Sequence, residues 1–236
     1  MLKNINIKLI KLIKYYSLIN YNLIYNNQTI NRYNNSSFMQ GPNSQQLNKL
    51  KNSIINIKNC ELKKNASNMV FSDGNPNSKI MIIGEGPGAN EDKEGLPFVG
   101  RAGQLLDKML FSINLDRRNV YITNVVNYRP PENRKPTEEE IAKYLPYLTK
   151  HIEIINPKIL VLLGSTALNS IIGNEKVISK IRGNWIEKKI GSCKTSVIVT
   201  FHPAFLMRQP EQKKMAWIDL KMIRKKILEY KIKIEK

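Results

Sequence analysis

A glycine-rich segment with four carboxylates is the first part of the chain whose residue types suggest chemistry. The segment GEGPGANEDKEGLPFVG spans residues 84–100 and carries Glu85, Glu91, Asp92 and Glu94. Glycine-rich loops commonly bind phosphate, because their bare backbone N–H groups can approach an anion closely. Here the four negative charges would repel a phosphate group. The segment is therefore expected to serve another kind of ligand.

Other polar segments also stand directly after short apolar runs. They are Asn124 with NYRPPENR (127–134), Gly164 with Ser165, and FHPAFLMR (201–208). In an open α/β sheet, ligands bind in the crevice beyond the carboxyl ends of the strands. We therefore expect these segments and the glycine-rich segment to line one pocket.

The apolar runs alternate with amphipathic segments along the chain. Strands are predicted at residues 79–83, 119–126, 158–163 and 195–200, and helices at residues 102–113, 138–155 and 165–172 and from about residue 210. Thr137 and Glu140 form a capping box before the second of these helices. Continuous apolar strands that alternate with helices indicate a parallel sheet covered on both faces. The predicted fold class is α/β, a three-layer α/β/α sandwich with a central, mainly parallel four-stranded sheet.

The charge of the chain favours a polyanionic partner. The 236 residues include 38 Lys and Arg against 19 Asp and Glu, which gives a formal net charge of +19. Nucleic acid suits such a chain, an anionic membrane is the competing partner, and drift in base composition is a third source of surplus lysines. No apolar run approaches the ~20 residues that span a bilayer, since Lys8, Lys11 and Lys14 interrupt the first candidate. We therefore expect a nucleic-acid partner and no membrane.

The amino-terminal residues differ in composition from the rest of the chain. The first fifty contain no acidic residue and include an asparagine-rich stretch that is typical of a linker. We predict a basic extension and polar linker over residues 1–45 and one compact domain over residues 46–236. The extension is open to three interpretations: an organelle-targeting segment, a DNA-gripping arm or an inert tail. The expected location is cytoplasmic, or organellar if the extension is a targeting segment.

Four motifs, in this order and spacing, carry a resemblance to a known family: GEGPGANEDKEGLPFVG, VYITNVV, RPPENRKPT and FHPAFLMRQPE. From about Cys60 to about Leu228, the chain resembles the family 4 uracil-DNA glycosylases of the uracil-DNA glycosylase superfamily. Motifs in register are far more specific than any glycine-rich loop alone. The resemblance implies hydrolysis of the N-glycosidic bond of deoxyuridine in DNA, which releases uracil and leaves an abasic site for base excision repair.

The resemblance implies that three residues bind the uracil base. Phe98 would stack on the base once it is flipped out of the duplex. Asn124 would accept a hydrogen bond from uracil N3–H and donate one to O4, and cytosine presents the reverse pattern at these atoms. Gly86 and its neighbours would form the pocket floor. From residue type alone, Phe98 could equally belong to the core and Asn124 to a turn.

Catalysis is implied to involve one histidine and several polar side chains. His202 would donate to uracil O2, where negative charge develops as the bond breaks. Glu91 and Asp92 would lie close to the sugar, which becomes positively charged. Either Glu85 or Asn133 would orient the attacking water, and their residue types do not decide between them.

The segment behind the histidine matches the position where the superfamily pushes a wedge into the duplex. Leu206 or Met207 would fill the vacated stack, and Arg208 would hold a phosphate. An apolar patch at the start of a helix is the alternative. The expected partner is uracil-containing DNA, single- or double-stranded, bound by a monomer.

The chain departs from the family at the ligands of its [4Fe–4S] cluster. At the positions of the four cluster cysteines it has Ile57, Cys60, Tyr128 and Tyr144. Since one thiolate cannot replace four, we expect no metal and no cofactor, with the two tyrosines packed at the position of the cluster. Cys193, the other cysteine, forms no metal or redox spacing with Cys60, which favours a reducing compartment.

Two other functions remain open from the sequence. A catalytically silent nucleic-acid-binding module would keep the fold and the basic surface, although the presence of Phe98, Asn124 and His202 favours an enzyme. A glycosylase for another deaminated base, such as hypoxanthine, would differ only in details of the pocket.

Overall fold

The structure is a computed structural model that describes residues 43–173 and 177–234. Most of the extension predicted for residues 1–45 lies outside the described residues, so its division from the domain stays a prediction. Within the described ranges, no helix combines the length and the apolar character needed to cross a membrane.

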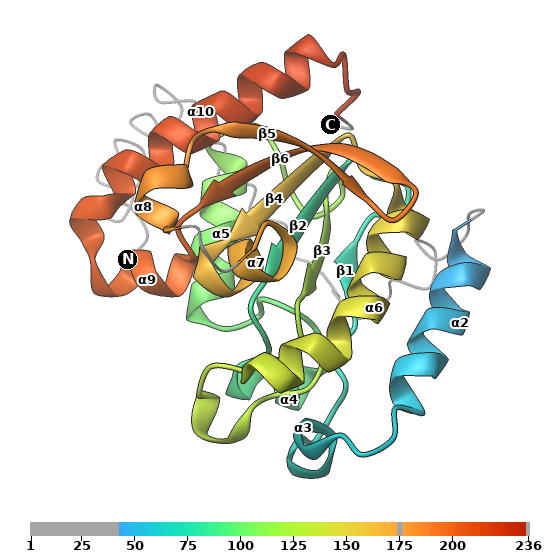
Figure 1. Cartoon of the computed structure of the whole chain (residues 1–236). Coiled ribbons are helices and arrows are strands. Elements are labelled where there is room, and N and C mark those ends of the chain that lie inside the picture. The colour runs from blue at the N-terminus through green and yellow to red at the C-terminus, as the bar shows by residue number, and fades with distance from the viewer. Residues whose placement is uncertain (1–42, 174–176, 235–236) are drawn as a thin grey trace, which may run out of the picture. The chain divides into compact units, whose positions relative to one another are not determined.

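A mixed sheet forms the centre of the fold (Figure 1), and its strands lie in the order β1-β3-β2-β4-β6-β5. The strands are β1 (Asp73–Gly74), β2 (Ile80–Gly84), β3 (Tyr121–Asn124), β4 (Ile159–Leu163), β5 (Trp185–Ile190) and β6 (Cys193–Thr200). The inner strands β3, β2, β4 and β6 run parallel, which confirms the predicted α/β sandwich. Antiparallel β1 and β5 at the edges make the sheet of the described residues six-stranded, where four strands were predicted.

The two edge strands, β1 and β5, were not predicted because neither forms a continuous apolar run. β1 is only two residues long. β5 has the sequence WIEKKI and is mostly half-buried or exposed, because no other strand of the described residues pairs with its outer edge. Charged side chains are typical of such edges, where they discourage pairing with other chains. A search for continuous apolar runs therefore finds the inner strands and misses both edges.

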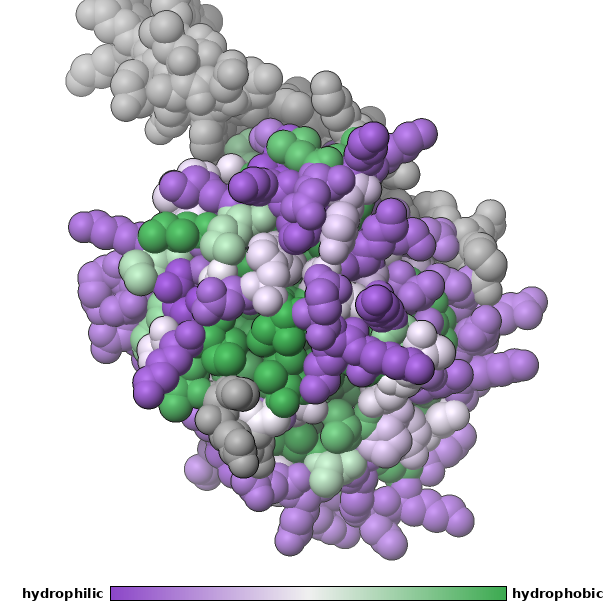
Figure 2. Space-filling view, turned by 45° about the horizontal axis from the view of Figure 1, so that its top comes forward, coloured by the Kyte–Doolittle hydropathy of each residue, from purple (hydrophilic) through white to green (hydrophobic). Residues whose placement is uncertain are grey.

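Helices cover both faces of the sheet in two apolar layers (Figure 1). One layer contains α2 (Ser44–Ile55), α6 (Glu138–Ile155) and α7 (Gly164–Ile171). The other contains α5 (Arg101–Phe111), α9 (Pro203–Arg208) and α10 (Lys213–Glu229). Successive strand residues point to opposite faces, so Tyr121 belongs to the first layer and Ile122 to the second. Figure 2 shows one face of the molecule, on which hydrophilic side chains surround a smaller apolar area.

Short helical segments join the longer elements. They are α3 (Glu61–Asn65), α4 (Ala89–Glu94), α8 (Ile178–Ile181) and the 3₁₀ turns η2 (Pro131–Asn133) and η3 (Pro210–Gln212). Two of them, α4 and η2, lie in segments that follow β2 and β3, where the sequence predicts ligand-binding loops.

α6 has the bounds that the sequence predicts, and its start explains why. Thr137 Oγ1 accepts a hydrogen bond from Glu140 N at 3.2 Å, and Glu140 Oε2 accepts one from Thr137 N at 2.8 Å. These two bonds are the predicted capping box, which satisfies backbone donors that a helix start leaves unpaired. Asn156 ends the helix in the left-handed conformation, with φ of 47°.

Candidate active site

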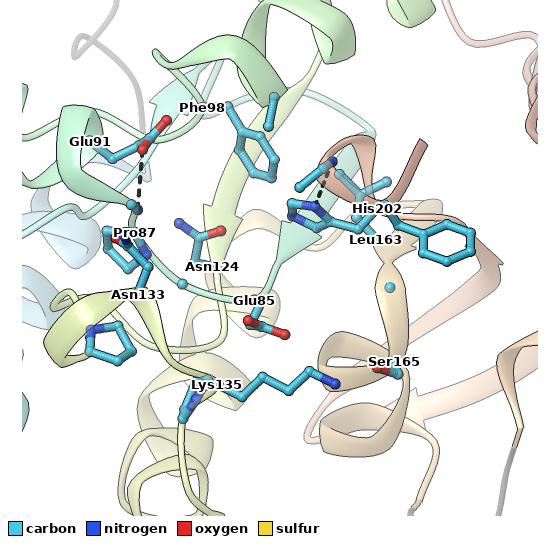
Figure 3. Close-up of a pocket in the computed structure, with 18 of the residues that line it drawn as sticks. Glu85, Pro87, Glu91, Phe98, Asn124, Asn133, Lys135, Leu163, Ser165 and His202 are labelled. Atoms are coloured by element: carbon cyan, nitrogen blue, oxygen red, sulfur yellow. Dashed lines mark hydrogen bonds between the residues drawn. The ribbon is translucent and has the colours of Figure 1, made fainter. Parts of the chain in front are cut away.

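The segments that follow the inner strands line one pocket, as the sequence predicts (Figure 3). Its volume is about 560 Å³, which is in the usual range for small-ligand sites. Of the predicted site residues, the lining includes Glu85, Gly86, Glu91, Phe98, Asn124, Asn133, His202 and Arg208. Residues up to 123 positions apart (Glu85 and Arg208) therefore meet here because the parallel strands all end at the same edge of the sheet.

Two glycines of the first segment are required by the packing of the pocket wall. A β carbon on Gly84 would lie 2.4 Å from Asn124 Oδ1 and 2.5 Å from Phe98 Cζ. A β carbon on Gly86 would lie 2.8 Å from Val126 Cγ2. All three distances are shorter than a van der Waals contact. Gly84 and Gly86 thus allow neighbouring side chains to pack closely against the backbone. The glycines in this segment have a packing role that does not require a bound phosphate.

Asn124 is a buried polar residue that the described protein leaves unsatisfied. It ends β3, pairs with Gly84 of β2, and is 3% exposed. Its Oδ1 is buried and has no hydrogen-bond partner among the described residues. A buried acceptor without a partner costs about 1–3 kcal/mol. In the described orientation, Oδ1 is the atom that this side chain leaves free to accept a hydrogen bond from a ligand.

Phe98 forms the wall of the pocket beside His202 (Figure 3). Its side chain is 5% exposed, and the two ring centroids lie 5.6 Å apart with 31° between the planes. The backbone of Phe98 is left-handed, with φ of 56°. Bulky residues rarely adopt this conformation, so the surrounding contacts must hold it in place.

His202 begins α9, and its two ring nitrogens differ. Nδ1 accepts a hydrogen bond from Ala204 N at 3.1 Å. The accepting nitrogen carries no proton, so the neutral ring carries its proton on Nε2. Burial, and then the charge of Arg208, lower the pKa of His202 to about 4. The imidazole is therefore neutral at pH 7 and keeps one N–H donor for a ligand.

Glu85 follows β2 directly, and one of its two carboxylate oxygens is hydrogen-bonded within the protein. Its Oε2 accepts a hydrogen bond from Thr166 Oγ1 of α7, and Oε1 receives none from the described residues. Thr166 itself is 8% exposed, which fixes the position of the carboxylate. Glu85 thus has one oxygen anchored and one oxygen available to a water molecule or a sugar.

The next two carboxylates bind backbone N–H groups. Glu91 Oε1 accepts from Gly100 N at 2.8 Å and Oε2 accepts from Gly88 N at 3.1 Å, which ties the two ends of the segment together. Asp92 Oδ1 accepts from the backbone N–H groups of residues 67 and 68 at 2.9 and 3.0 Å. Asp92 is not among the residues that line the pocket. Its carboxylate anchors another loop, so this geometry gives no support to the place predicted for Asp92 beside the sugar, which stays a prediction.

The RPPENRKPT segment forms the exposed mouth of the pocket. Asn133 is exposed there, and its Oδ1 accepts a hydrogen bond from Arg129 Nε at 2.8 Å. Lys135 from the same segment also lines the pocket, and Figure 3 shows its side chain extending across the opening. Lys135 was not predicted as a site residue, although its segment follows an inner strand and this place was an available signal.

The three residues predicted to contact DNA lie on α9 and differ in their exposure to solvent. Leu206 is 1% exposed and belongs to the apolar layer of α5 and α10. Leu206 is thus a core residue in the described conformation, and its role as a wedge stays a prediction. Met207 is partly exposed and Arg208 is exposed. Only these two of the three can meet DNA in the described conformation.

Known proteins are similar to the chain over most of its length. It is 49% identical over 150 residues to the type-4 uracil-DNA glycosylase of Thermotoga maritima, which covers 63% of this chain and 77% of the relative. The type-4 enzyme of Sulfurisphaera tokodaii is 44% identical over 183 residues, or 75% of this chain and 83% of the relative. That of Archaeoglobus fulgidus is 40% identical over 174 residues, or 72% and 87%.

These relatives contradict the prediction that the protein has no cofactor. Type-4 uracil-DNA glycosylases are a family that binds an iron–sulfur cluster. An absence of any cofactor is therefore not supported for a chain with this degree of similarity to them.

The side chains at the four expected cluster positions can be tested for their fit to such a cluster. Ile57, Cys60, Tyr128 and Tyr144 are each at most 8% exposed and lie in one apolar layer. Cys60 Sγ lies 3.2 Å from Tyr144 Oη, and burial together with Cys60 raises the pKa of both tyrosines. A [4Fe–4S] cluster is normally held by four thiolates. In the described part of the chain, no three His, Cys, Asp or Glu side chains form a metal-binding group. These residues do not fit the cluster.

The family model for the uracil DNA glycosylase superfamily matches residues 71–221. This range contains the inner parallel strands and all of the pocket segments described above. Fold, pocket and similarity thus point in the same direction. The chain belongs to the uracil-DNA glycosylase superfamily.

Proposed function

We infer that the protein is a uracil-DNA glycosylase, which hydrolyses the N-glycosidic bond of deoxyuridine in DNA and releases uracil. The observation that carries this inference is the unpartnered, buried Oδ1 of Asn124 in a pocket that it shares with Phe98 and His202. Uracil is flat and offers an N–H donor between two carbonyl acceptors, which matches these side chains. Five type-4 relatives at 39–49% identity support the same activity.

In the bound state, the base is recognised by complementary polar atoms. Asn124 accepts from uracil N3–H through Oδ1 and donates to O4 through Nδ2. His202 donates to O2 through Nε2, which is the nitrogen left protonated by the bond from Ala204. Phe98 contacts the face of the base. Cytosine would leave both polar atoms of Asn124 opposed to like groups, so the site rejects it.

Bond cleavage places negative charge on the base and positive charge on the sugar. The N–H of His202 stabilises the departing uracil anion. The carboxylate of Glu85 stabilises the positive sugar, orients a water molecule and accepts its proton as the water oxygen bonds to C1′ and the bond to N1 breaks. Uracil leaves as the anion and takes up a proton from solvent. Glu85 suits this role better than Asn133, because Asn133 Oδ1 already accepts a bond from Arg129 at the exposed mouth. Glu91, held at both oxygens, positions the loop instead of acting on the substrate.

Glu85→Gln is expected to lower the single-turnover rate of uracil release by about 10²-fold, the lower end for a general base, since glutamine can still hydrogen-bond a water. Glu94→Gln is the matched control, because Glu94 belongs to the same segment and does not line the pocket. A Glu85→Gln variant that works at the parent rate would transfer the water-orienting role to Asn133.

Arg208 and Lys135 are proposed to bind DNA phosphates at the pocket mouth, since both are exposed cations that line the pocket. Each change to glutamine should weaken DNA binding and reduce the slope of log Kd against log salt by about one. Lys150→Gln is the control, because Lys150 pairs with Glu153 at 3.2 Å and does not line the pocket. An unchanged salt slope in both variants would contradict phosphate contacts at these positions.

We further propose that the enzyme acts as a monomer on uracil in single- or double-stranded DNA. The base-binding, leaving-group and water-orienting roles proposed above are all filled by residues of one copy of the chain, which supports a site that needs no second copy. Sedimentation at assay concentrations tests this, and a dimer would contradict it. We also propose a cytoplasmic location, or an organellar one if the amino-terminal extension is a transit segment. Sequencing of the mature amino terminus separates the two locations.

The function is tested by incubating the purified protein with oligonucleotides that contain one uracil, hypoxanthine or cytosine. Free uracil and an abasic strand are expected from the uracil substrate. A folded protein that binds DNA and yields no abasic product on either single- or double-stranded substrate would contradict the proposed activity. Release of hypoxanthine alone would assign the pocket to another deaminated base.

A further inference from the structure

Arg117 joins the loop that carries Phe98 to two neighbouring elements. Its Nη1 donates to the backbone oxygen of Pro97 at 3.0 Å, and its Nη2 donates to that of Phe98. Nη1 also donates to Asp73 Oδ2 of β1 at 2.5 Å, and Nε donates to Asp107 Oδ1 of α5 at 2.8 Å. One planar guanidinium thus binds two carbonyls of the pocket wall and two carboxylates behind them.

The environment makes this group of residues rigid. The side chains of Arg117, Asp73 and Asp107 are 23, 13 and 35% exposed. Burial lowers the pKa of Arg117, but the hydrogen bonds to Asp107 and Asp73 outweigh it, and the pKa lies above its ordinary value. The guanidinium is permanently charged, and a partly buried charge that lost its partners would be strongly unfavourable. The guanidinium therefore keeps its charge and its donors to the two carbonyls.

Phe98 needs such support because its backbone is held in an unfavourable conformation. A left-handed φ of 56° costs a non-glycine residue about 1–2 kcal/mol. Both the backbone carbonyl and the ring of Phe98 are closely packed against glycines. A β carbon on Gly103 would lie 1.7 Å from its carbonyl oxygen, and one on Gly84 would lie 2.5 Å from its ring. Because the carbonyl and the ring are attached to the same Cα, a shift of the carbonyl would displace the ring within this tight space, and Arg117 binds the carbonyl.

We propose that Arg117 is a positioning residue of the active site, which sets the Phe98 ring against the base through the Phe98 carbonyl. Arg117 does not line the pocket, so it acts without touching the substrate. The inference rests on the proposed function, since it uses Phe98 as the contact for uracil. It adds a residue from the turn before β3 to the determinants of the reaction.

Arg117→Lys keeps the charge but replaces a planar five-donor group with a single ammonium, which cannot bind both carbonyls and both carboxylates at once. The rate of uracil release at saturating enzyme is expected to fall by about 10–10²-fold, the range for a small misplacement of a positioning group. Arg118→Lys is the matched control. Arg118 is the next residue, pairs with Asp116 at 2.5 Å, and has a side chain that is 54% exposed.

A double-mutant cycle with Phe98→Leu separates positioning from a purely structural role. If Arg117 acts through the aromatic ring, Arg117→Lys should lower the rate by less than about twofold once Phe98 is leucine. An equal loss in both backgrounds would overturn the inference, even if the melting temperature of the variant falls. If Arg117→Lys does not fold, Asp107→Asn takes its place in the same cycle, because that partner is the most exposed of the three residues.

The parent protein distinguishes the two ways in which the experiment can fail. A parent that releases no uracil refutes the proposed function. A parent that releases uracil, together with equal effects of Arg117→Lys in both backgrounds, refutes only the positioning role.

Discussion

Asn124→Asp is expected to lower uracil excision by more than about 10³-fold, because a site built to hydrogen-bond its substrate rejects a mismatched pattern strongly. The change replaces the amide donor with an acceptor, so that an ionised side chain faces uracil O4 with like partial charges. Asn124 is 3% exposed, and little solvent can relieve this repulsion. Because burial favours a protonated carboxyl, which could still donate, the rates should be compared at about pH 8.

The measurement is the single-turnover rate on single-stranded DNA with uracil or cytosine in the same context. Any gain of cytosine excision is expected to be weak, since neutral cytosine is the poorer leaving group. Asn127→Asp is the matched control. Asn127 is 4% exposed and close in sequence, but its Nδ2 donates to Val70 O at 2.9 Å and it does not line the pocket. If Asn124→Asp cuts uracil as fast as the parent, Asn124 does not contact the base and the base lies elsewhere.

His202→Ala is expected to lower the rate of bond cleavage by about 10²–10³-fold, the usual effect of removing one donor to a developing negative charge. DNA affinity should change far less, because the donor acts mainly on charge that appears in the transition state. Single-turnover rates and a binding titration on an uncleavable substrate measure the two quantities. Equal losses of rate and affinity would make His202 a binding residue.

The pKa of His202 predicts the pH profile of the parent enzyme. Its value of about 4 lies below the ordinary 6.5, so the folded state favours the neutral ring. The associated stability is complete above pH 6.5 and is lost as the pH falls toward about 4. His202 should therefore cause no change in rate between about pH 8 and pH 5.5. A step in the rate near pH 6.5 that disappears in His202→Ala would contradict the neutral donor.

The inner strands could be predicted from the sequence because strands buried on both faces are continuous apolar runs. All five residues of β4, Ile159–Leu163, are buried, so both faces of this strand must be apolar. The edge strand β5 has one open edge and a charged sequence, and its pairing with β6 depends on the hairpin rather than on an apolar run. A strand that forms because it pairs with a neighbouring strand need not have an apolar pattern in its own sequence.

The sequence predicts the site residues whose place follows from the ends of the inner strands. Phe98, Asn124 and His202 follow inner strands and meet in the pocket. Which way a side chain points is a matter of packing between distant segments. Leu206 turns into the core and Asp92 binds the backbone of residues 67 and 68, and strand ends predict neither contact. The Arg117 contacts join elements from β1 to β3 and have no local sequence pattern.

The central claim is that Asn124 reads the base, and the crystal structure of the protein with uracil bound in the pocket tests it most directly. We expect the Asn124 carboxamide within hydrogen-bonding distance of uracil N3 and O4, His202 Nε2 beside O2, and the face of the base against Phe98. Uracil bound outside the pocket, or an Asn124 side chain turned away from a bound base, would contradict the claim.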